Sequence, residues 1–174
     1  DPSFGSPELP VTGLNWAEAN RYCAWVGGNL PTEAQWERAA KGNSNRVFPW
    51  GRQYEAQFAN HGTVGGEADA SDGFLYAAPV DACENGKSIQ GVYNLAGNVW
   101  EWVRDRYAPD QYRTEQRVNP VGAFSGSQRV IRGGSWRSAP HTLRASARSY
   151  VNENESRSDI GFRCVYEGPG IGTD

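Results

Sequence analysis

One stretch of twelve residues, 91–102, constrains the fold more than any other part of the chain. It reads Gly-Val-Tyr-Asn-Leu-Ala-Gly-Asn-Val-Trp-Glu-Trp and combines three large aromatic side chains with the hard oxygen atoms of Asn94, Asn98 and Glu101. A tight turn around a hard cation would use both kinds of residue, because Ca²⁺ takes about six to eight oxygen ligands from carboxylates, amides and backbone carbonyls. Gly97 would allow the backbone to turn its carbonyls inward. A buried aromatic turn whose polar groups bond to one another explains the same spacing equally well.

Composition limits the kinds of protein that this chain can be. It has 174 residues, a net charge of −3 and no basic stripe, and these features argue against a nucleic-acid partner. No apolar run is long enough to cross a membrane. The 21 glycines, 10 prolines and 7 tryptophans favour a single loop-rich domain held by aromatic packing. Because methionine is absent, we expect that sequence before Asp1 is missing, and residues 168–174 are expected to form a frayed tail.

Two helices are predicted near the start of the chain. The first begins after Asn15, which forms a capping box with Glu18, and its apolar residues recur at helical spacing until Gly27-Gly28. The second begins at Thr32 with another capping box and ends at Gly42. These are the only helices that the sequence supports.

From Asn43 onward, short apolar runs alternate with Gly, Asn, Asp and Pro. This pattern predicts small strands and long loops, and the clearest strands are 129–132 and 161–166. Loops of this length in a compact domain are usually functional or disordered, and their aromatic content favours order. The predicted fold class is therefore α+β, with two helices, short strands and long ordered loops.

Five motifs in the chain resemble those of one known family. They occur in the family's order and spacing, and they are Leu30–Ala40, Phe48–Gly51, Tyr93–Trp102, Arg132–Trp136 and Gly161–Cys164. Over about residues 10–166 the chain resembles the formylglycine-generating enzyme family, also called the sulfatase-modifying-factor domain. The resemblance implies an irregular C-type-lectin-like fold, and it implies that a β-rich segment precedes Asp1. One fold can host many kinds of site, so function needs separate evidence.

The resemblance also implies two structural calcium sites, each made of two side chains and two backbone carbonyls. The first would comprise Asn94, Gly97, Val99 and Glu101. The second would comprise Asn60, His61, Asp72 and Phe74. We expect Ca²⁺ at both places and favour the first more strongly. An ordinary acidic loop is the alternative for the second.

Three cysteines bear on stability. Cys23 lies on the first predicted helix and Cys164 ends the last motif, and the resemblance implies that the two form the family's disulfide. Two buried thiols that pack as small apolar groups are the alternative. The disulfide would close most of the chain, which the loop-entropy model values at about 4–5 kcal/mol as an upper figure. It would favour an extracytoplasmic or thermophilic setting, whereas Cys83 is expected to be unpaired.

The family's oxidase chemistry requires a different cysteine pair, shortly after the Gly-Gly-Ser-Trp motif. That pair binds Cu(I) and engages the substrate thiol, and soft thiolates are the ligands that select Cu(I). Here Ser138 takes the first position, and no cysteine takes the second, where the chain is also shorter. Trp100 and Ser135 match other active-site residues of the family. Without the thiolates we expect neither copper binding nor formylglycine generation by this chain.

Two other catalytic sites are conceivable. A relative of the family, the sulfoxide synthase that makes ergothioneine, holds iron with three histidines largely from another domain, but this chain has only His61 and His141. It could supply at most part of such a site. Ser138 and His141 could form a nucleophile–base pair, yet no carboxylate is marked to orient the histidine. The expectation for His141 is a loop residue near the surface.

Binding through residues 137–159 is the leading alternative to catalysis. This segment is rich in Ser, Asn, Arg, Tyr and His, which suit adaptable recognition surfaces, although a plain solvated loop would have a similar composition. Relatives diversified by retroelements place their variable residues in the same segment. The predicted ligand surface comprises Trp100, Ser135, Trp136, Arg137, Ser138, His141, Tyr150, Asn152 and Asn154. Arg144 and Arg148 are instead expected to be salt-bridge partners.

The sequence therefore predicts a calcium-stabilised module that binds a protein or a small molecule and does not itself generate formylglycine. It could be a diversified variable protein. The alternative is an oxygen- or metal-dependent oxidoreductase of the same family that needs residues from outside this chain. The sequence leaves the ligand and the oligomeric state open.

Overall fold

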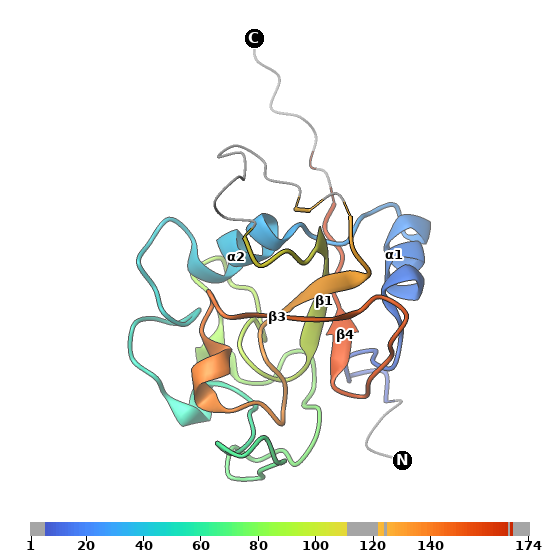
Figure 1. The fold of residues 1–174 in the computed structure, drawn as a ribbon. Helices are drawn as coiled ribbons and strands as arrows, with labels where there is room; N and C mark the ends of the chain where they lie inside the picture. Colours follow the sequence, from blue (N-terminus) through green and yellow to red (C-terminus); the bar gives the residue numbers. More distant parts are fainter. Residues whose placement is uncertain (1–5, 111–121, 124, 167, 169–174) are drawn as a thin grey trace.

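The computed structural model describes residues 6–110, 122–123, 125–166 and 168 (Figure 1). Of the predicted tail 168–174, only residue 168 is therefore described. The elements in chain order are α1 (Trp16–Trp25), α2 (Glu33–Lys41), η1 (Ala56–Phe58), η2 (Glu84–Gly86), β1 (Trp100–Arg106), β2 (Gln128–Arg132), η3 (Pro140–Leu143), β3 (Arg148–Asn152) and β4 (Ile160–Phe162). Two helices, one small sheet and long loops form an α+β fold, which confirms the predicted class.

The four strands form one mixed sheet in the order β3-β2-β1-β4. β2 is antiparallel to β1 and β3, whereas β4 runs parallel to β1 at the edge of the sheet. The register between β1 and β2 shifts between Trp102 and Arg106, and such an irregularity bends a strand. Both helices contact β1, so the sheet lies between them (Figure 1).

Both helices begin where the sequence predicts. The Asn15 side chain accepts from the Glu18 N–H at 3.0 Å, and the Glu18 carboxylate accepts from the Asn15 N–H at 2.9 Å. Thr32 and Gln35 form the same reciprocal pair before α2. α2 ends at Gly42, whose φ of 64° favours glycine. Local side-chain to backbone bonds thus fix the helix starts.

The strand predictions are partly right. Residues 128–132 form β2, but the last strand is shorter than 161–166, because Val165 leaves the sheet to bridge Asn29. The prediction of one tight turn over 91–102 holds only for its first part, since Trp100 to Trp102 lie in β1. A packed strand accommodates Glu101 because neighbouring donors satisfy its carboxylate.

The core consists of three clusters of buried side chains. The first, beneath α1, contains Ala19, Cys23, Leu30, Trp100, Trp102, Ile131, Val151 and Ile160. The second, beneath α2, contains Trp36, Ala40, Leu95, Val103, Val130 and Ala145. The third lies among the loops and contains Phe48, Ala59, Ala96 and Leu143. The long loops therefore have a core of their own, which explains their order.

A disulfide joins Cys23 of α1 to Cys164 after β4, with their Cα atoms 5.4 Å apart. The predicted pairing is confirmed. Cys83 is a free, half-buried thiol, also as predicted. The crosslink spans 141 residues of sequence and ties the first helix to the end of the domain.

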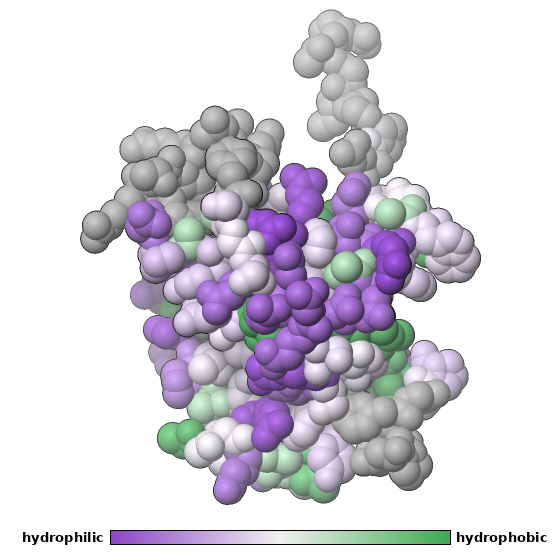
Figure 2. Space-filling view, turned by 45° about the vertical axis from the view of Figure 1, so that its right-hand side comes forward, coloured by the Kyte–Doolittle hydropathy of each residue, from purple (hydrophilic) through white to green (hydrophobic). Residues whose placement is uncertain are grey.

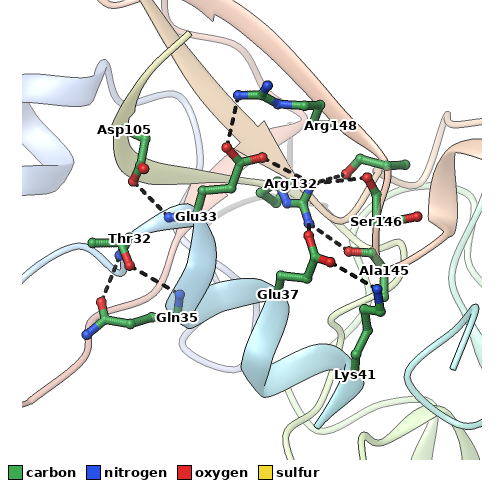
Figure 3. Close-up of polar contacts among 11 residues, drawn as sticks. Thr32, Glu33, Gln35, Glu37, Lys41, Asp105, Arg132, Ala145, Ser146 and Arg148 are labelled. Atoms are coloured by element: carbon green, nitrogen blue, oxygen red, sulfur yellow. Dashed lines mark hydrogen bonds and ion pairs between the residues drawn. The ribbon is translucent and has the colours of Figure 1, made fainter. Parts of the chain in front are cut away.

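Arg132 links α2 to the sheet (Figure 3). Its guanidinium is fully buried and pairs with Glu37 at 2.7 Å and Glu33 at 3.2 Å, while carbonyls in 145–147 accept from it. Arg148 pairs with Glu33 at 2.9 Å, which confirms the predicted salt bridge. A buried arginine is tolerated here because its charge is paired and both terminal nitrogens donate hydrogen bonds, whereas its Nε has no partner within the described residues.

Figure 2 shows one face of the molecule, where hydrophilic residues gather over the middle and apolar residues lie beside them.

Arg144 differs from its prediction, because its Nε donates to the His141 carbonyl at 2.9 Å and no ion pair of Arg144 is found within the described residues. Neither α1 nor α2 nor any other described helix has the length and apolarity that crossing a bilayer requires.

Candidate functional site

Three turns of the chain meet at Gly97-Asn98. The Asn98 N–H donates to the Asn60 carbonyl at 2.8 Å, and the Asn98 carbonyl accepts from the Trp136 N–H at 2.8 Å. Gly97 donates to the Gly133 carbonyl at 2.9 Å. The segment 94–98 therefore holds the 60–80 loop and the Gly-Gly-Ser-Trp turn in fixed positions.

The side chain of Asn98 serves this junction and is not free for a ligand. Its Oδ1 accepts from the Ala78 N–H at 2.9 Å, and its Nδ2 donates to the Ala78 carbonyl at 3.1 Å. Asn98 is 1% exposed and has a φ of 66°, a conformation that asparagine tolerates better than most residues. The Asn98 side chain therefore bonds to the backbone of another loop and not to the other polar groups of residues 91–102.

Asn94 differs from Asn98. Its Nδ2 donates to the Val80 carbonyl at 2.9 Å, but its Oδ1 is buried and has no hydrogen-bond partner within the described residues. Nearby in sequence, the Glu101 carboxylate accepts from Trp36 Nε1 at 2.7 Å and from Arg163 Nε at 2.6 Å. Burial alone would lower the pKa of Arg163, but the Glu101 carboxylate outweighs this effect and raises that pKa. Glu101 and Arg163 therefore form an ion pair in which the two opposite charges compensate each other.

The 60–74 loop contains the second predicted ligand set. Both Asp72 oxygens accept backbone N–H groups, from His61 at 2.7 Å and from Phe74 at 2.9 Å. Asn60 is fully buried; its Nδ2 donates to the Tyr76 carbonyl at 2.8 Å, whereas its Oδ1 has no partner within the described part of the chain. Within that part, Asp72 forms no ion pair.

The negative charge of Asp72 affects its surroundings. Burial raises the pKa of Tyr54, and the charges of Asp72 and Asp69 raise it further. Burial and Asp72 likewise raise the pKa of the Cys83 thiol, although a hydrogen bond from the Asn60 backbone opposes this. A carboxylate that perturbs its neighbours and forms no ion pair within the described residues is suited to attract a cation.

Two asparagine oxygens thus stand out in the predicted metal positions. Buried polar atoms are almost always hydrogen-bonded, so an unpartnered one is a natural position for a bound water or ion. Asn60 Oδ1 and Asn94 Oδ1 are both of this kind, and each belongs to a different predicted ligand set. The donors are hard oxygens, which suit Ca²⁺. No group of three or more His, Cys, Asp or Glu side chains able to hold a metal occurs among the described residues.

The positions of the family's oxidase chemistry form a closed polar cluster. Ser135 Oγ donates to Asp159 Oδ2 at 3.1 Å, and Ser138 Oγ accepts from the Ser135 N–H at 2.9 Å. Asp159 is also paired with Arg157. All three residues are buried: Ser135 is 0% exposed, Ser138 8% and Asp159 2%. Their polar groups therefore bond to one another and not to solvent. Asp159 was not identified from sequence, because only the fold brings it beside Ser135.

The two histidines lie in different surroundings. His61 is buried, and its Nδ1 lies 3.0 Å from the Gly62 carbonyl. His141 is exposed, as predicted, but it lies on the short helix η3 and not in a loop, and within the described residues it makes no hydrogen bond to Ser138. The geometry therefore gives no support to a Ser138–His141 nucleophile–base pair.

The structure divides the predicted ligand surface into two groups. Trp100, Ser135, Trp136 and Ser138 are buried. Arg137, His141, Tyr150, Asn152 and Asn154 are exposed. Arg137 lies over the Trp136 ring at 5.5 Å, and Tyr150 stacks on Tyr107 with ring centroids 4.0 Å apart. Only the second group can contact a ligand without rearrangement of the fold.

Comparisons with known proteins support the family resemblance that the motifs and the fold indicate. The family model described as "Sulfatase-modifying factor enzyme 1-like domain" matches residues 3–168. The formylglycine-generating enzyme of Bos taurus is 39% identical over 169 residues, which cover 91% of this chain and 44% of that protein. The "Inactive C-alpha-formylglycine-generating enzyme 2" of Mus musculus is 36% identical over 166 residues, which cover 91% and 49%.

A solved structure has a similar fold. The structure of PvdO from Pseudomonas aeruginosa superimposes with a TM-score of 0.77 at 26% identity, covering 90% of this chain and 61% of that chain. The chain spans about half the length of the two curated relatives. The match over nearly all of its residues shows that this chain belongs to the formylglycine-generating enzyme family, the sulfatase-modifying-factor domains.

Proposed function

We propose that this chain is a calcium-stabilised binding module in which the copper chemistry of the family has been lost. The observation that carries the proposal is that Ser138, at a copper-cysteine position of the family, is buried in a cluster with Ser135 and Asp159. Hydroxyl and carboxylate oxygens are poor ligands for Cu(I), which prefers thiolates. The family includes relatives named as active and as inactive enzymes at similar identity, so identity alone does not decide between the two.

A direct assay tests the loss of oxidase activity. The purified chain is loaded with Cu(I), supplied with oxygen and incubated with a cysteine-containing peptide, and the peptide is analysed by mass spectrometry. We expect the cysteine to remain unchanged. Formation of an aldehyde at that cysteine by the chain alone would contradict the proposal. It would favour the second candidate, an oxidoreductase of the same family.

The calcium part of the proposal is supported by the two unpartnered asparagine oxygens. Sequence favours the Asn94–Glu101 site, but Arg163 already neutralises Glu101, and its positive charge would repel a nearby cation. Asp72 carries a negative charge that meets only backbone N–H groups in the described part of the chain. We therefore rank the Asn60–Asp72 site above the Asn94–Glu101 site for Ca²⁺.

Metal analysis of matched variants tests both sites. We expect about one to two Ca²⁺ per chain after dialysis, with Asp72→Asn losing one ion and raising the apparent dissociation constant more than Glu101→Gln does. Calcium at about 100 times its dissociation constant should stabilise the fold by about 2.7 kcal/mol. Glu67→Gln, at an exposed position of the same loop, is the control and should retain calcium. Wild-type protein without bound calcium would refute this part.

Ligand recognition is assigned to the exposed members of the predicted surface, Arg137, His141, Tyr150, Asn152 and Asn154. Tyr150 presents a stacked, 44%-exposed ring, which is a low-entropy contact group. Diversification of residues 137–159 stays a prediction. A template repeat of this segment beside the gene would support it, whereas an adjoining histidine-bearing domain would favour the oxidoreductase.

A further inference from the structure

The loop between β3 and β4 contains a sequence motif that neither calcium binding nor the copper positions use. Residues 154–156 read Asn-Glu-Ser, which matches the Asn-x-Ser acceptor pattern for N-linked glycans, with a residue other than proline in the middle. No other asparagine of the chain is followed two positions later by serine or threonine. We call residues 154–156 the acceptor motif. So short a pattern also arises by chance, and its place in the structure decides whether a glycan can be attached there.

The acceptor motif lies in an exposed turn shortly after β3. Asn154, Glu155 and Ser156 are all exposed. Asn152 closes the turn, because its Oδ1 accepts from the Asn154 N–H at 3.0 Å and its carbonyl accepts from the Glu155 N–H at 3.0 Å. Within the described residues, neither the side-chain amide of Asn154 nor the hydroxyl of Ser156 forms a hydrogen bond. The two groups that the acceptor pattern requires are therefore accessible from solvent.

The residues that flank the acceptor motif are held by the body of the domain. Glu153 pairs with Arg106 at 3.0 Å and with Arg129 at 2.9 Å. On the other side, the Arg157 carbonyl accepts from the Gly13 N–H at 3.1 Å. Between these anchors, and within the described part of the chain, no hydrogen bond or ion pair joins the motif to a residue outside 152–157. A bulky, hydrated sugar at this place therefore needs no packed group to move.

The disulfide between Cys23 and Cys164 is an independent observation that points the same way. Disulfides form and persist mainly in secreted proteins and in the lumen of the secretory pathway, and they are rare in a reducing cytosol. The crosslink favours an extracytoplasmic or a thermophilic setting. The first of these is the setting in which Asn-x-Ser acceptors are modified.

We infer that Asn154 is the acceptor of an N-linked oligosaccharide. The donor is an oligosaccharide carried on a lipid diphosphate, and a separate transferase joins the two. A bond forms between Asn154 Nδ2 and the anomeric carbon of the first sugar, while the bond from that carbon to the diphosphate oxygen breaks. The lipid diphosphate leaves with the electron pair of that bond, and the proton lost by Nδ2 passes through a base of the transferase to solvent. Nothing is oxidised or reduced.

Glycosylation of Asn154 goes beyond the proposed function and requires neither calcium nor the loss of the copper chemistry. It would take the Asn154 side chain out of direct contact with a ligand. The exposed recognition residues would then be Arg137, His141, Tyr150 and Asn152.

Secretion of the full chain from a eukaryotic host cell tests the assignment. The secreted protein is analysed by mass spectrometry before and after treatment with a glycosidase that releases N-linked glycans and converts the acceptor asparagine to aspartate. We expect a heavier form that falls to the mass of the polypeptide on treatment, with aspartate at position 154 in the peptide map. Calcium content and aldehyde formation, measured on the same preparation, report on the proposed function separately.

Four variants locate the acceptor. Asn154→Gln and Ser156→Ala should each abolish the heavier form, whereas Ser156→Thr keeps the hydroxyl and should retain it. Ser158→Ala is the matched control, since Ser158 is exposed in the same loop but lies outside the motif, and it should be glycosylated as wild type is. The changed residues are all exposed, so the variants should unfold at the same urea concentration as wild type once the glycan is removed.

The disulfide also provides an internal control for the result. Molecules in which Cys23 and Cys164 are joined have passed through an oxidising compartment. Unmodified Asn154 in such molecules would overturn the inference, since the acceptor was then available and was not used. A glycan that persists in Ser156→Ala, or one attached only at another asparagine, would overturn it as well.

Discussion

At the scale of single residues, a comparison of two glycines shows that the close packing of two loops at Asn60 and Gly97 requires glycine at position 97. Gly97 and Gly73 both have positive φ, 80° and 101°. A Cβ on Gly97 would lie 2.0 Å from the Asn60 carbonyl oxygen, whereas nothing lies within 4 Å of a Cβ on Gly73. The two positions therefore share backbone strain and differ in steric contact. Sequence marks both as turn glycines, but only the structure distinguishes them.

Alanine at these two positions separates strain from contact. Gly73→Ala should cost about 1–2 kcal/mol from the left-handed backbone alone. Gly97→Ala should cost more, at least about 3 kcal/mol, because the Asn60 carbonyl must also move and its bond to Asn98 would be disturbed. Urea denaturation of both variants measures the difference. Equal destabilisation would show that the Gly97–Asn60 contact is relaxed without cost.

At the scale of elements, local signals were predictable and non-local ones were not. Capping boxes at Asn15 and Thr32 could be predicted because all their atoms lie within four residues of sequence. Strand β1 could not, since Glu101 fits a packed strand only through Trp36 and Arg163, which are 65 and 62 residues away. The same holds for Asp159, which reaches Ser135 across 24 residues.

The cap of α2 can be tested separately from its packing. Thr32→Ala removes the acceptor of the Gln35 N–H and should lower the free energy of unfolding by about 1 kcal/mol. Thr32→Ser keeps the hydroxyl and should recover most of that loss. Chemical denaturation of the two variants beside wild type measures this. If serine were as damaging as alanine, the lost methyl packing and not the cap would be responsible.

At the scale of the whole molecule, the fold class and the disulfide pairing could be predicted through the resemblance, which extends over nearly the whole chain. The closed Ser135–Ser138–Asp159 cluster could not, because it arises where separate segments of the chain pack together. The described part of the domain has nine short strand and helix segments with long loops between them, so it depends on side-chain contacts and on the Cys23–Cys164 crosslink to hold its loops.

The crosslink gives the last prediction. Replacing both Cys23 and Cys164 by alanine frees a loop of 141 residues in the unfolded chain, and the loop-entropy model sets the loss at about 4–5 kcal/mol. For a domain of this size that loss lowers the melting temperature by about 10–15 °C. Cys83→Ala is the matched control, since its thiol is unpaired. Calorimetry should therefore show dithiothreitol lowering the melting temperature of wild type and Cys83→Ala alike, and leaving the double variant unchanged. A double variant as stable as wild type would mean that core packing alone holds α1 to the end of β4.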